Sequence, residues 1–301
     1  MCNATFPKII QPHEKLEPIE RCLQNPPLQG SYGPSTIDLR VHETIRIGDE
    51  HNAQLVVVEI LTANPPVKAL TQGAHVVAKI YDPLYVDDDN LYINPFMVAN
   101  KSYTHEVASY EALSDLQGLK IPQYYGSYSL DIPVKSSTTI TPTKRSVRLI
   151  LIEQIFGTCM RDLNPDEISP STRQHIMKLL IEYDTLIFSK KLILGDLHPR
   201  NIMLTNDSII LVDFGDTLFP STDTFAEDSF EILPTTSISP ILRWHKVNTS
   251  TRRNYDFDGW IDWKWQPWLE AEFKHTAASI TPELRELFIP ARALEAESES
   301  D

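Results

Sequence analysis

The chain has 301 residues, of which 42% are hydrophobic and 9% aromatic, values that are ordinary for a globular protein with a sizeable core. Its 27 basic and 41 acidic residues give a formal net charge of −14. A field of that sign repels a phosphate backbone, so the charge argues against nucleic acid as a partner.

The cysteines and the first residues bear on the compartment. Cys2, Cys22 and Cys159 are scattered and show no CxxC or Cys/His metal spacing, so neither a disulfide framework nor a zinc site is expected, and a reducing compartment fits best. No basic segment with a following apolar run opens the chain, and no stretch approaches about 18 uncharged apolar residues. We therefore expect a cytoplasmic or nuclear protein without membrane association.

The first half of the chain reads as a lead-in followed by strands. Residues 1–34 are rich in Pro, Gln and Asn and have little periodicity, which predicts an irregular or partly disordered segment. Residues 36–47, 53–61 and 75–82 are rich in Val and Ile with partial alternation, and turn-like stretches separate them. This pattern predicts three strands of an antiparallel sheet.

One helix and two more strands complete this region. Residues 102–113 place apolar side chains on one helical face, and residues 121–130 and 146–155 read as strands. The polar tract at residues 136–143 predicts an exposed loop between those two strands. Five strands and one helix make a small lobe over residues 35–155.

After about residue 157 the pattern becomes mostly helical. Residues 164–167 (Asn-Pro-Asp-Glu) resemble a helix-capping sequence, and residues 171–189 carry apolar side chains at spacings of three and four, which predicts a longer helix. Residues 201–204 and 209–214 read as two short strands. Helices are expected again over residues 258–288. The helical stripe of the longer helix consists of Ile176, Leu179, Leu180, Tyr183, Leu186 and Ile187.

These elements predict an α+β fold with four parts. The lead-in covers residues 1–34, the sheet lobe residues 35–155, the mainly helical lobe residues 156–290, and an acidic, solvated tail residues 291–301.

Three polar residues lie at the ends of the two short strands. Asp196 lies on a loop that leads through Asn201 into the first strand, and the second strand delivers Asp213. An Asp and an Asn at the rims of adjacent strands can converge on one divalent cation, and the loop Asp can then face an incoming hydroxyl.

Residues 196–201 (Asp-Leu-His-Pro-Arg-Asn), followed by residues 213–215 (Asp-Phe-Gly), resemble the catalytic loop and metal-binding motif of protein kinases and of aminoglycoside/choline phosphotransferases. The resemblance implies a two-lobed protein-kinase-like fold with an antiparallel N-lobe and a mainly helical C-lobe. It also implies transfer of the γ-phosphoryl group of Mg·ATP to a hydroxyl. In that scheme Asp196 accepts or orients the hydroxyl, and Asn201 and Asp213 hold Mg²⁺.

A lysine and a glutamate upstream fit the same resemblance. Residues 76–80 (Val-Val-Ala-Lys-Ile) resemble the third-strand lysine motif, which implies that Lys79 contacts the α- and β-phosphates of ATP. This lysine supplies the local cation that the net charge of −14 makes necessary at a nucleotide site. Glu106 lies where the family places the partner of that lysine, and Glu111 is the alternative. The competing interpretation is an exposed strand lysine and a solvated helix glutamate.

Two further segments correspond to nucleotide-binding parts of the family. Residues 149–155 resemble the strand and hinge that receive adenine, with backbone donors and acceptors from Glu153 to Ile155. The turn after the first strand should cradle phosphates with backbone amides, yet it contains a single glycine, Gly48, and two acids. Phosphate affinity is therefore expected to be weak.

Other positions depart from the family pattern. Leu194 replaces the histidine that normally braces the catalytic loop, and His198 replaces the lysine of Ser/Thr protein kinases, which is closer to small-molecule phosphotransferases. No Ala-Pro-Glu follows Asp213, and the remaining chain is short for a complete C-lobe. These features indicate a reduced or atypical kinase.

All tryptophans fall in one C-terminal stretch that also contains Asp256, Asp258 and Asp262. They either pack the helices of that region or form an aromatic, acidic pocket for a cationic substrate. Residues 239–244, together with this stretch, resemble kinase-like proteins of fungi. The tryptophans are Trp244, Trp260, Trp263, Trp265 and Trp268.

The sequence thus predicts an ATP- and Mg²⁺-dependent phosphotransferase that acts on a hydroxyl of a protein or of a cationic small molecule. The alternative is a pseudokinase or scaffold module that binds nucleotide weakly without turnover. A metal-dependent hydrolase using the same acids is a third possibility, but it lacks a His-rich metal cluster.

Overall fold

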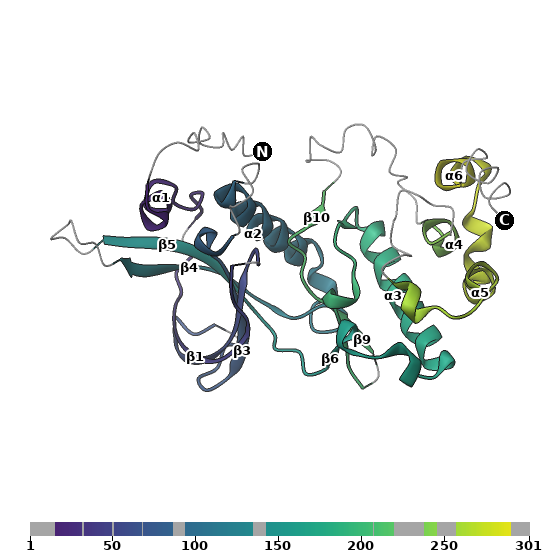
Figure 1. Cartoon of the computed structure of the whole chain (residues 1–301), viewed down its shortest axis with the longest axis horizontal. Helices are drawn as coiled ribbons and strands as arrows, with labels where there is room; N and C mark the ends of the chain where they lie inside the picture. Colours follow the sequence, from purple (N-terminus) through teal and green to yellow (C-terminus); the bar gives the residue numbers. More distant parts are fainter. Residues whose placement is uncertain are drawn as a thin grey trace. The chain divides into compact units, whose positions relative to one another are not determined.

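The computed structural model describes residues 16–31, 33–49, 51–67, 69–86, 94–134, 143–206, 208–219, 238–245 and 257–289. Helices and an antiparallel sheet occur together, which confirms the α+β class (Figure 1). The chain divides into two compact units. The first unit comprises Met1–Ala108 and Gln123–Gln154, and the second comprises Ser109–Pro122 and Ile155–Asp301.

The first unit is built on a five-stranded sheet in which every neighbouring pair is antiparallel, in the order β1-β2-β3-β5-β4. All five strands coincide with predicted ones. Strands β2 and β4 are longer than the sequence pattern indicated, β1 and β3 each end one residue earlier, and β5 begins and ends three residues earlier. Their bounds are β1 Thr36–Arg46, β2 Gln54–Asn64, β3 His75–Tyr81, β4 Tyr124–Val134 and β5 Thr143–Ile152.

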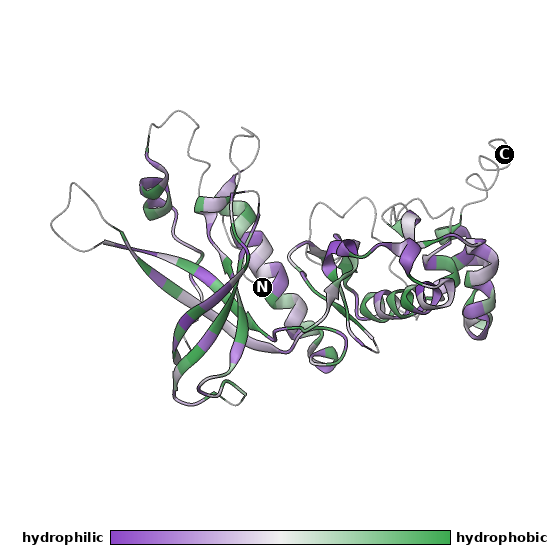
Figure 2. Ribbon diagram, turned by 60° about the horizontal axis from the view of Figure 1, so that its bottom comes forward, coloured by the Kyte–Doolittle hydropathy of each residue, from purple (hydrophilic) through white to green (hydrophobic). Residues whose placement is uncertain are grey.

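The two faces of this sheet bury different residues because side chains alternate along a strand. On one face Val56, Ala78 and Leu151 lie side by side and form the centre of a hydrophobic core. On the other face Lys79 and Tyr81 point toward helix α2 (Pro95–Ala112). Figure 2 shows hydrophobic and hydrophilic bands alternating along these strands.

Helix α2 begins earlier than the predicted start at residue 102. Asn94 caps it, since its Oδ1 accepts hydrogen bonds from the backbone N–H groups of Phe96 and Met97 at 3.0 and 3.2 Å. Pro95 occupies the first helical position, where its missing N–H costs nothing. The Asn94-Pro95 pair therefore marks the start of this helix, which the spacing of apolar residues does not indicate.

The expectation of an irregular lead-in was wrong for one segment. Residues Pro18–Gln24 form helix α1, with Pro18 at the first position and the Glu20 carboxylate accepting from the Glu17 N–H at 3.4 Å. The helix buries Cys22, and this burial raises the pKa of the Cys22 thiol. A helix of seven residues is too short for a periodic stripe, so tertiary packing rather than pattern fixes it.

The second unit contains the long helix α3 (Pro170–Ser189), three small strand pairs and short C-terminal helices. The predicted stripe of α3 is confirmed at Ile176, Leu180, Tyr183 and Ile187, which are buried, whereas Leu179 and Leu186 are half-buried. The remaining elements are β6 Thr158–Cys159, β7 Ile193–Leu194, β8 Ile202–Leu204, β9 Ile209–Leu211, β10 Thr217–Leu218, α4 Pro240–Arg243, α5 Trp265–Glu272 and α6 Pro282–Phe288.

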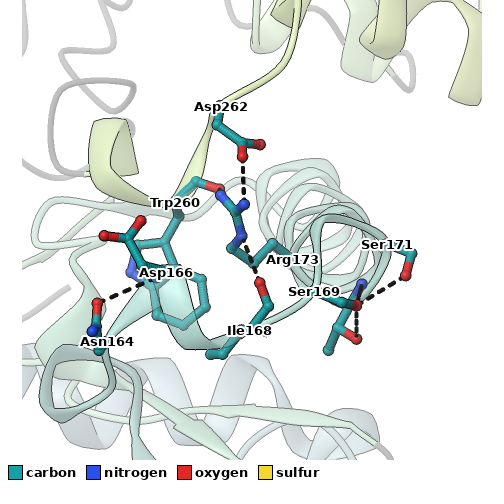
Figure 3. Close-up of polar contacts among 9 residues, drawn as sticks. Asn164, Asp166, Ile168, Ser169, Ser171, Arg173, Trp260 and Asp262 are labelled. Carbon is teal, nitrogen blue, oxygen red and sulfur yellow. Dashed lines mark hydrogen bonds and ion pairs between the residues drawn. The ribbon is translucent and has the colours of Figure 1, made fainter.

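The capping sequence at residues 164–167 does not start the long helix. Asn164 caps a short 3-10 turn, Pro165–Glu167, and its side chain accepts from the Asp166 N–H at 3.2 Å (Figure 3). Helix α3 has its own cap in Ser169, whose hydroxyl accepts from the Thr172 N–H at 3.2 Å. The helices expected over residues 258–288 are likewise broken into α5, a 3-10 segment and α6.

Several expectations lie outside the described residues. These are the ends of the chain at residues 1–15 and 290–301, and the loop at residues 136–142. Within the ranges that the structure describes, no helix is both long and apolar enough to cross a membrane.

Candidate functional site

A hairpin in the second unit brings Asn201 and Asp213 to one end. Strands β8 and β9 pair antiparallel with Ile202 opposite Leu211, Asn201 directly precedes β8, and Asp213 follows β9 after one residue. The Val212 N–H donates to the Asn201 carbonyl at 2.9 Å, which ties the two strand ends together. Both residues therefore line one pocket, as the strand pattern predicted.

Asp196 lines the same pocket and is held by two neighbours. Nδ2 of Asn201 donates to the carboxylate Oδ2 of Asp196 at 2.7 Å and to its carbonyl at 2.9 Å. Nη2 of Arg200 donates to Oδ1 at 2.6 Å. The carboxylate is thus fixed in direction while 28% of its side chain stays exposed. The sequence motif gives no role to Arg200.

Asp213 has a left-handed backbone conformation. Its φ is 67°, in the left-handed region, which is uncommon for a residue other than glycine. Strain of this kind costs of order 1–3 kcal/mol and concentrates at functional sites. The next residue, Phe214, is buried and packs edge-on against Tyr110 at a centroid distance of 5.3 Å, which anchors the strained turn.

The loop before Asp196 is braced by backbone contacts. Strands β7 and β10 pair with Leu194 opposite Thr217, and the Gly195 N–H donates to the Asp216 carbonyl at 3.2 Å. A Cβ at Gly195 would lie 2.2 Å from that carbonyl oxygen, so only glycine fits. Leu194 is buried in this strand pair and supports the loop by packing and pairing.

His198 and Cys159 support the turn that carries Asn201. Nδ1 of His198 accepts from the Arg200 N–H at 3.2 Å and so caps the 3-10 turn Pro199–Asn201. The Cys159 thiol donates to the Pro199 and Arg200 carbonyls at 3.7 and 3.5 Å. His198 therefore has a structural task in this turn.

In the first unit Lys79 and Glu106 form a buried ion pair, with Nζ and Oε2 at 2.5 Å and side-chain exposures of 4% and 0%. The predicted pairing is thus present, and the interpretation of both as solvated surface charges is wrong. Glu111, the alternative partner, is exposed. Tyr81, which the sequence reading overlooked, donates its hydroxyl to the same oxygen of Glu106 at 2.6 Å.

The turn after β1 is closed by a side chain. Oε1 of Gln54 accepts from the Gly48 N–H at 2.7 Å, and Nε2 of Gln54 donates to the Gly48 carbonyl at 2.9 Å. Gly48 has a φ of 130°, and Asp49 is exposed. The amide that was predicted to contact phosphates is therefore bonded within the protein.

The two other residues predicted to contact a nucleotide, Glu153 and Ile155, follow strand β5, which ends at Ile152. The backbone N–H of Glu153 donates to the Gln123 carbonyl at 2.9 Å, and its carboxylate accepts from the Gln123 N–H at 3.0 Å. Ile155 is half-buried and belongs to the second unit. The two contacts of Glu153 fix its backbone to Gln123, the residue directly before β4.

The tryptophan-rich stretch is joined to helix α3 by Arg173. The buried guanidinium donates to the Trp260 carbonyl at 3.0 Å and to the Asp262 carboxylate at 2.6 Å, as Figure 3 shows. Its carbon lies 5.9 Å from the centroid of the Trp263 ring.

The ring contacts continue from Trp263 toward the interior. Trp268 lies 5.5 Å from Trp263 and 5.1 Å from Trp265, and Trp265 donates its indole N–H to the carbonyl of the buried Trp244 at 3.0 Å. The chain's own arginine lies near the Trp263 ring and the other rings contact one another, which favours the packing interpretation. Asp256 lies outside the described residues.

The donor set in the pocket suits a hard cation. The Asn201 amide nitrogen is used on Asp196, so its amide oxygen and the Asp213 carboxylate are the atoms that could bind Mg²⁺. Within the described ranges, no group of three or more His, Cys, Asp or Glu side chains could hold a metal ion. Such a pair suits an ion that keeps waters and phosphate oxygens as its other ligands.

The comparisons with known proteins add no family assignment. No protein-family model matches the chain, and no curated protein matches it.

Proposed function

We propose that the chain is an ATP- and Mg²⁺-dependent phosphotransferase with a two-lobed protein-kinase-like fold. The observation that carries this proposal is the pocket in which Asp196, Asn201 and Asp213 meet, with Asp196 oriented by Asn201 and Asp213 in a strained conformation. The order and spacing of these residues match the phosphotransferase motif, and the buried Lys79–Glu106 pair supports it independently.

The residues have distinct tasks in this proposal. Asn201 and Asp213 hold Mg²⁺, which when bound would neutralise charge on the phosphate oxygens. Lys79 contacts the α- and β-phosphates, and Glu106 orients it. The cations are needed because a net charge of −14 repels a nucleotide.

Asp196 acts on the acceptor. Its carboxylate accepts a hydrogen bond from the substrate hydroxyl and orients the oxygen for attack on the γ-phosphorus. A bond forms between that oxygen and the γ-phosphorus, the bond to the β,γ-bridging oxygen breaks, and the hydroxyl proton passes to Asp196 and then to solvent. The hydrogen bonds from Arg200 and Asn201 keep the carboxylate pointed at the acceptor.

An ATP-consumption screen tests the proposal. Wild type and Asp196→Asn are compared with amine-bearing small molecules and with generic protein acceptors, each in Mg²⁺. We expect at least one acceptor to stimulate ATP consumption in wild type, and the substitution to reduce it by about 10²- to 10⁴-fold. Equal turnover in the two proteins would contradict the assigned role of Asp196.

One observation favours the pseudokinase alternative. The Gly48 amide is engaged by Gln54, so the turn lacks one of the donors that usually hold phosphates. A scaffold of this kind would bind Mg·ATP weakly and would show no acceptor-stimulated turnover in the same screen.

A further inference from the structure

The geometry of strand β3 places Tyr81 beside the Lys79–Glu106 pair. Lys79 and Tyr81 are two residues apart on β3, so both side chains leave the same face of the sheet toward α2. Their polar ends meet on one atom, since Oε2 of Glu106 accepts from Lys79 Nζ at 2.5 Å and from Tyr81 Oη at 2.6 Å.

All three side chains are removed from water. The relative exposures are 3% for Lys79, 2% for Tyr81 and 0% for Glu106. A buried carboxylate without hydrogen-bond donors is costly, and charge-assisted hydrogen bonds of this length are among the stronger ones in proteins. The Tyr81 hydroxyl is therefore a second donor, beside the ammonium, that stabilises the ionised Glu106.

The ring of Tyr81 does not need its hydroxyl to pack. It contacts Tyr103 edge-on at a centroid distance of 5.5 Å and an interplanar angle of 71°, and Lys79 Nζ lies 5.8 Å from its centroid. Phenylalanine would fill the same space. The hydroxyl is thus the part of Tyr81 that packing does not explain.

We propose that Tyr81 is a positioning residue for Lys79. Its hydroxyl holds the Glu106 carboxylate in place, so that the ammonium stays oriented when it shares its hydrogen bonds with phosphate oxygens. This inference rests on the proposed function, because it assigns Tyr81 to the same phosphate-binding lysine. The lysine motif at residues 76–80 ends directly before Tyr81, so the motif alone does not assign this role to Tyr81.

The neighbouring tyrosine provides a matched control. Tyr103 belongs to the same ring pair, yet its hydroxyl donates to Ser127 at 3.1 Å and not to Glu106. Tyr81→Phe and Tyr103→Phe therefore each remove one buried or half-buried hydroxyl from one ring pair. Only the first removes a donor to Glu106.

The test compares two ligands that differ in their phosphates. Calorimetric titrations with Mg·ATP and with adenosine are made on wild type, Tyr81→Phe and Tyr103→Phe. We expect Tyr81→Phe to bind Mg·ATP about 3- to 10-fold more weakly, the loss of one net hydrogen bond, with unchanged adenosine affinity. Tyr103→Phe should bind both ligands like wild type.

The outcomes separate this inference from the proposed function. Unchanged Mg·ATP affinity in Tyr81→Phe overturns the role of Tyr81 alone. The same conclusion follows if adenosine and Mg·ATP weaken equally, or if Tyr103→Phe shows the same loss, because the effect is then structural. If wild type itself binds no Mg·ATP, the proposed function is wrong and the inference falls with it.

Discussion

The two polar clusters of this protein differ in their exposure to solvent. In the first unit Lys79, Glu106 and Tyr81 satisfy one another away from water. In the second unit Asp196 remains partly exposed and Asp213 is held in a strained conformation. We call the first the closed cluster, because its polar groups are buried and bonded to one another, which fixes their geometry. We call the second the open cluster, because its partly exposed carboxylate and strained backbone allow it to bind a ligand. The function proposed above assigns positioning to the first cluster, and ligand binding and reaction to the second.

The largest effect should come from breaking the closed cluster. Lys79→Met leaves the Glu106 charge buried without its cation, which should destabilise the protein by about 3–5 kcal/mol. The matched control is Arg40→Met, on strand β1 of the same sheet, because Arg40 is 65% exposed and pairs with Glu59. We expect at most about 0.5 kcal/mol there. Urea unfolding measures both, and equal losses would show that Lys79 is not in a desolvated pair.

A smaller effect is expected from the brace of the open cluster. Gly195→Ala places a Cβ against the Asp216 carbonyl, so backbone must move and stability should fall by about 1–3 kcal/mol. Gly259→Ala, in the same unit, adds a methyl group where nothing lies within 4 Å. Thermal unfolding should leave that control within about 0.5 kcal/mol of wild type. A tolerated alanine at 195 would mean that the loop is not held as described.

Substitution of Arg200 tests how the Asp196 carboxylate is oriented. Arg200→Gln removes the donor to Asp196 Oδ1 and should lower kcat for an accepted substrate about tenfold, since the carboxylate is then fixed only by Asn201. Arg161→Gln, which alters an exposed pair with Asp162, is the control and should leave kcat unchanged. An unchanged kcat with a raised KM for Arg200→Gln would contradict an orienting role.

The smallest effect concerns the turn closed by Gln54. Gln54→Leu removes both hydrogen bonds to Gly48 and should lower the free energy of unfolding by about 1–2 kcal/mol. Because Gln54 competes with phosphate for the Gly48 amide, Mg·ATP affinity should not decrease. Unfolding and calorimetry report the two quantities separately. A loss of affinity would show instead that the closed turn is the binding form.

The sequence predicted those features that depend on local pattern. Strands β3 and β5 have apolar runs that allow few alternatives, and Asn201 and Asp213 meet because their strands are consecutive and short. The pairing of Lys79 with Glu106 followed from the motif. Local order and spacing thus carry most of the candidate site.

The remaining features depend on register and tertiary contact. The contact of Tyr81 with Glu106 depends on which face of the sheet packs against the helix. The contact of Gln54 with Gly48 depends on the conformation of the turn. Residue type alone reveals neither. The left-handed backbone of Asp213 is one of several conformations open to an Asp, so the residue type alone does not predict it. Helix α1 is fixed by packing over only seven residues.

The claim that the open cluster binds the metal is tested most directly by titrating ATP into wild type and Asp213→Asn, with and without Mg²⁺. Wild type should bind ATP at least about tenfold more tightly with Mg²⁺, a difference of about 1.4 kcal/mol in binding free energy. Asp213→Asn, which keeps the side-chain shape, should lose that difference while retaining its unfolding midpoint. ATP binding that is indifferent to Mg²⁺ in wild type, or a metal dependence that survives in Asp213→Asn, would contradict the account.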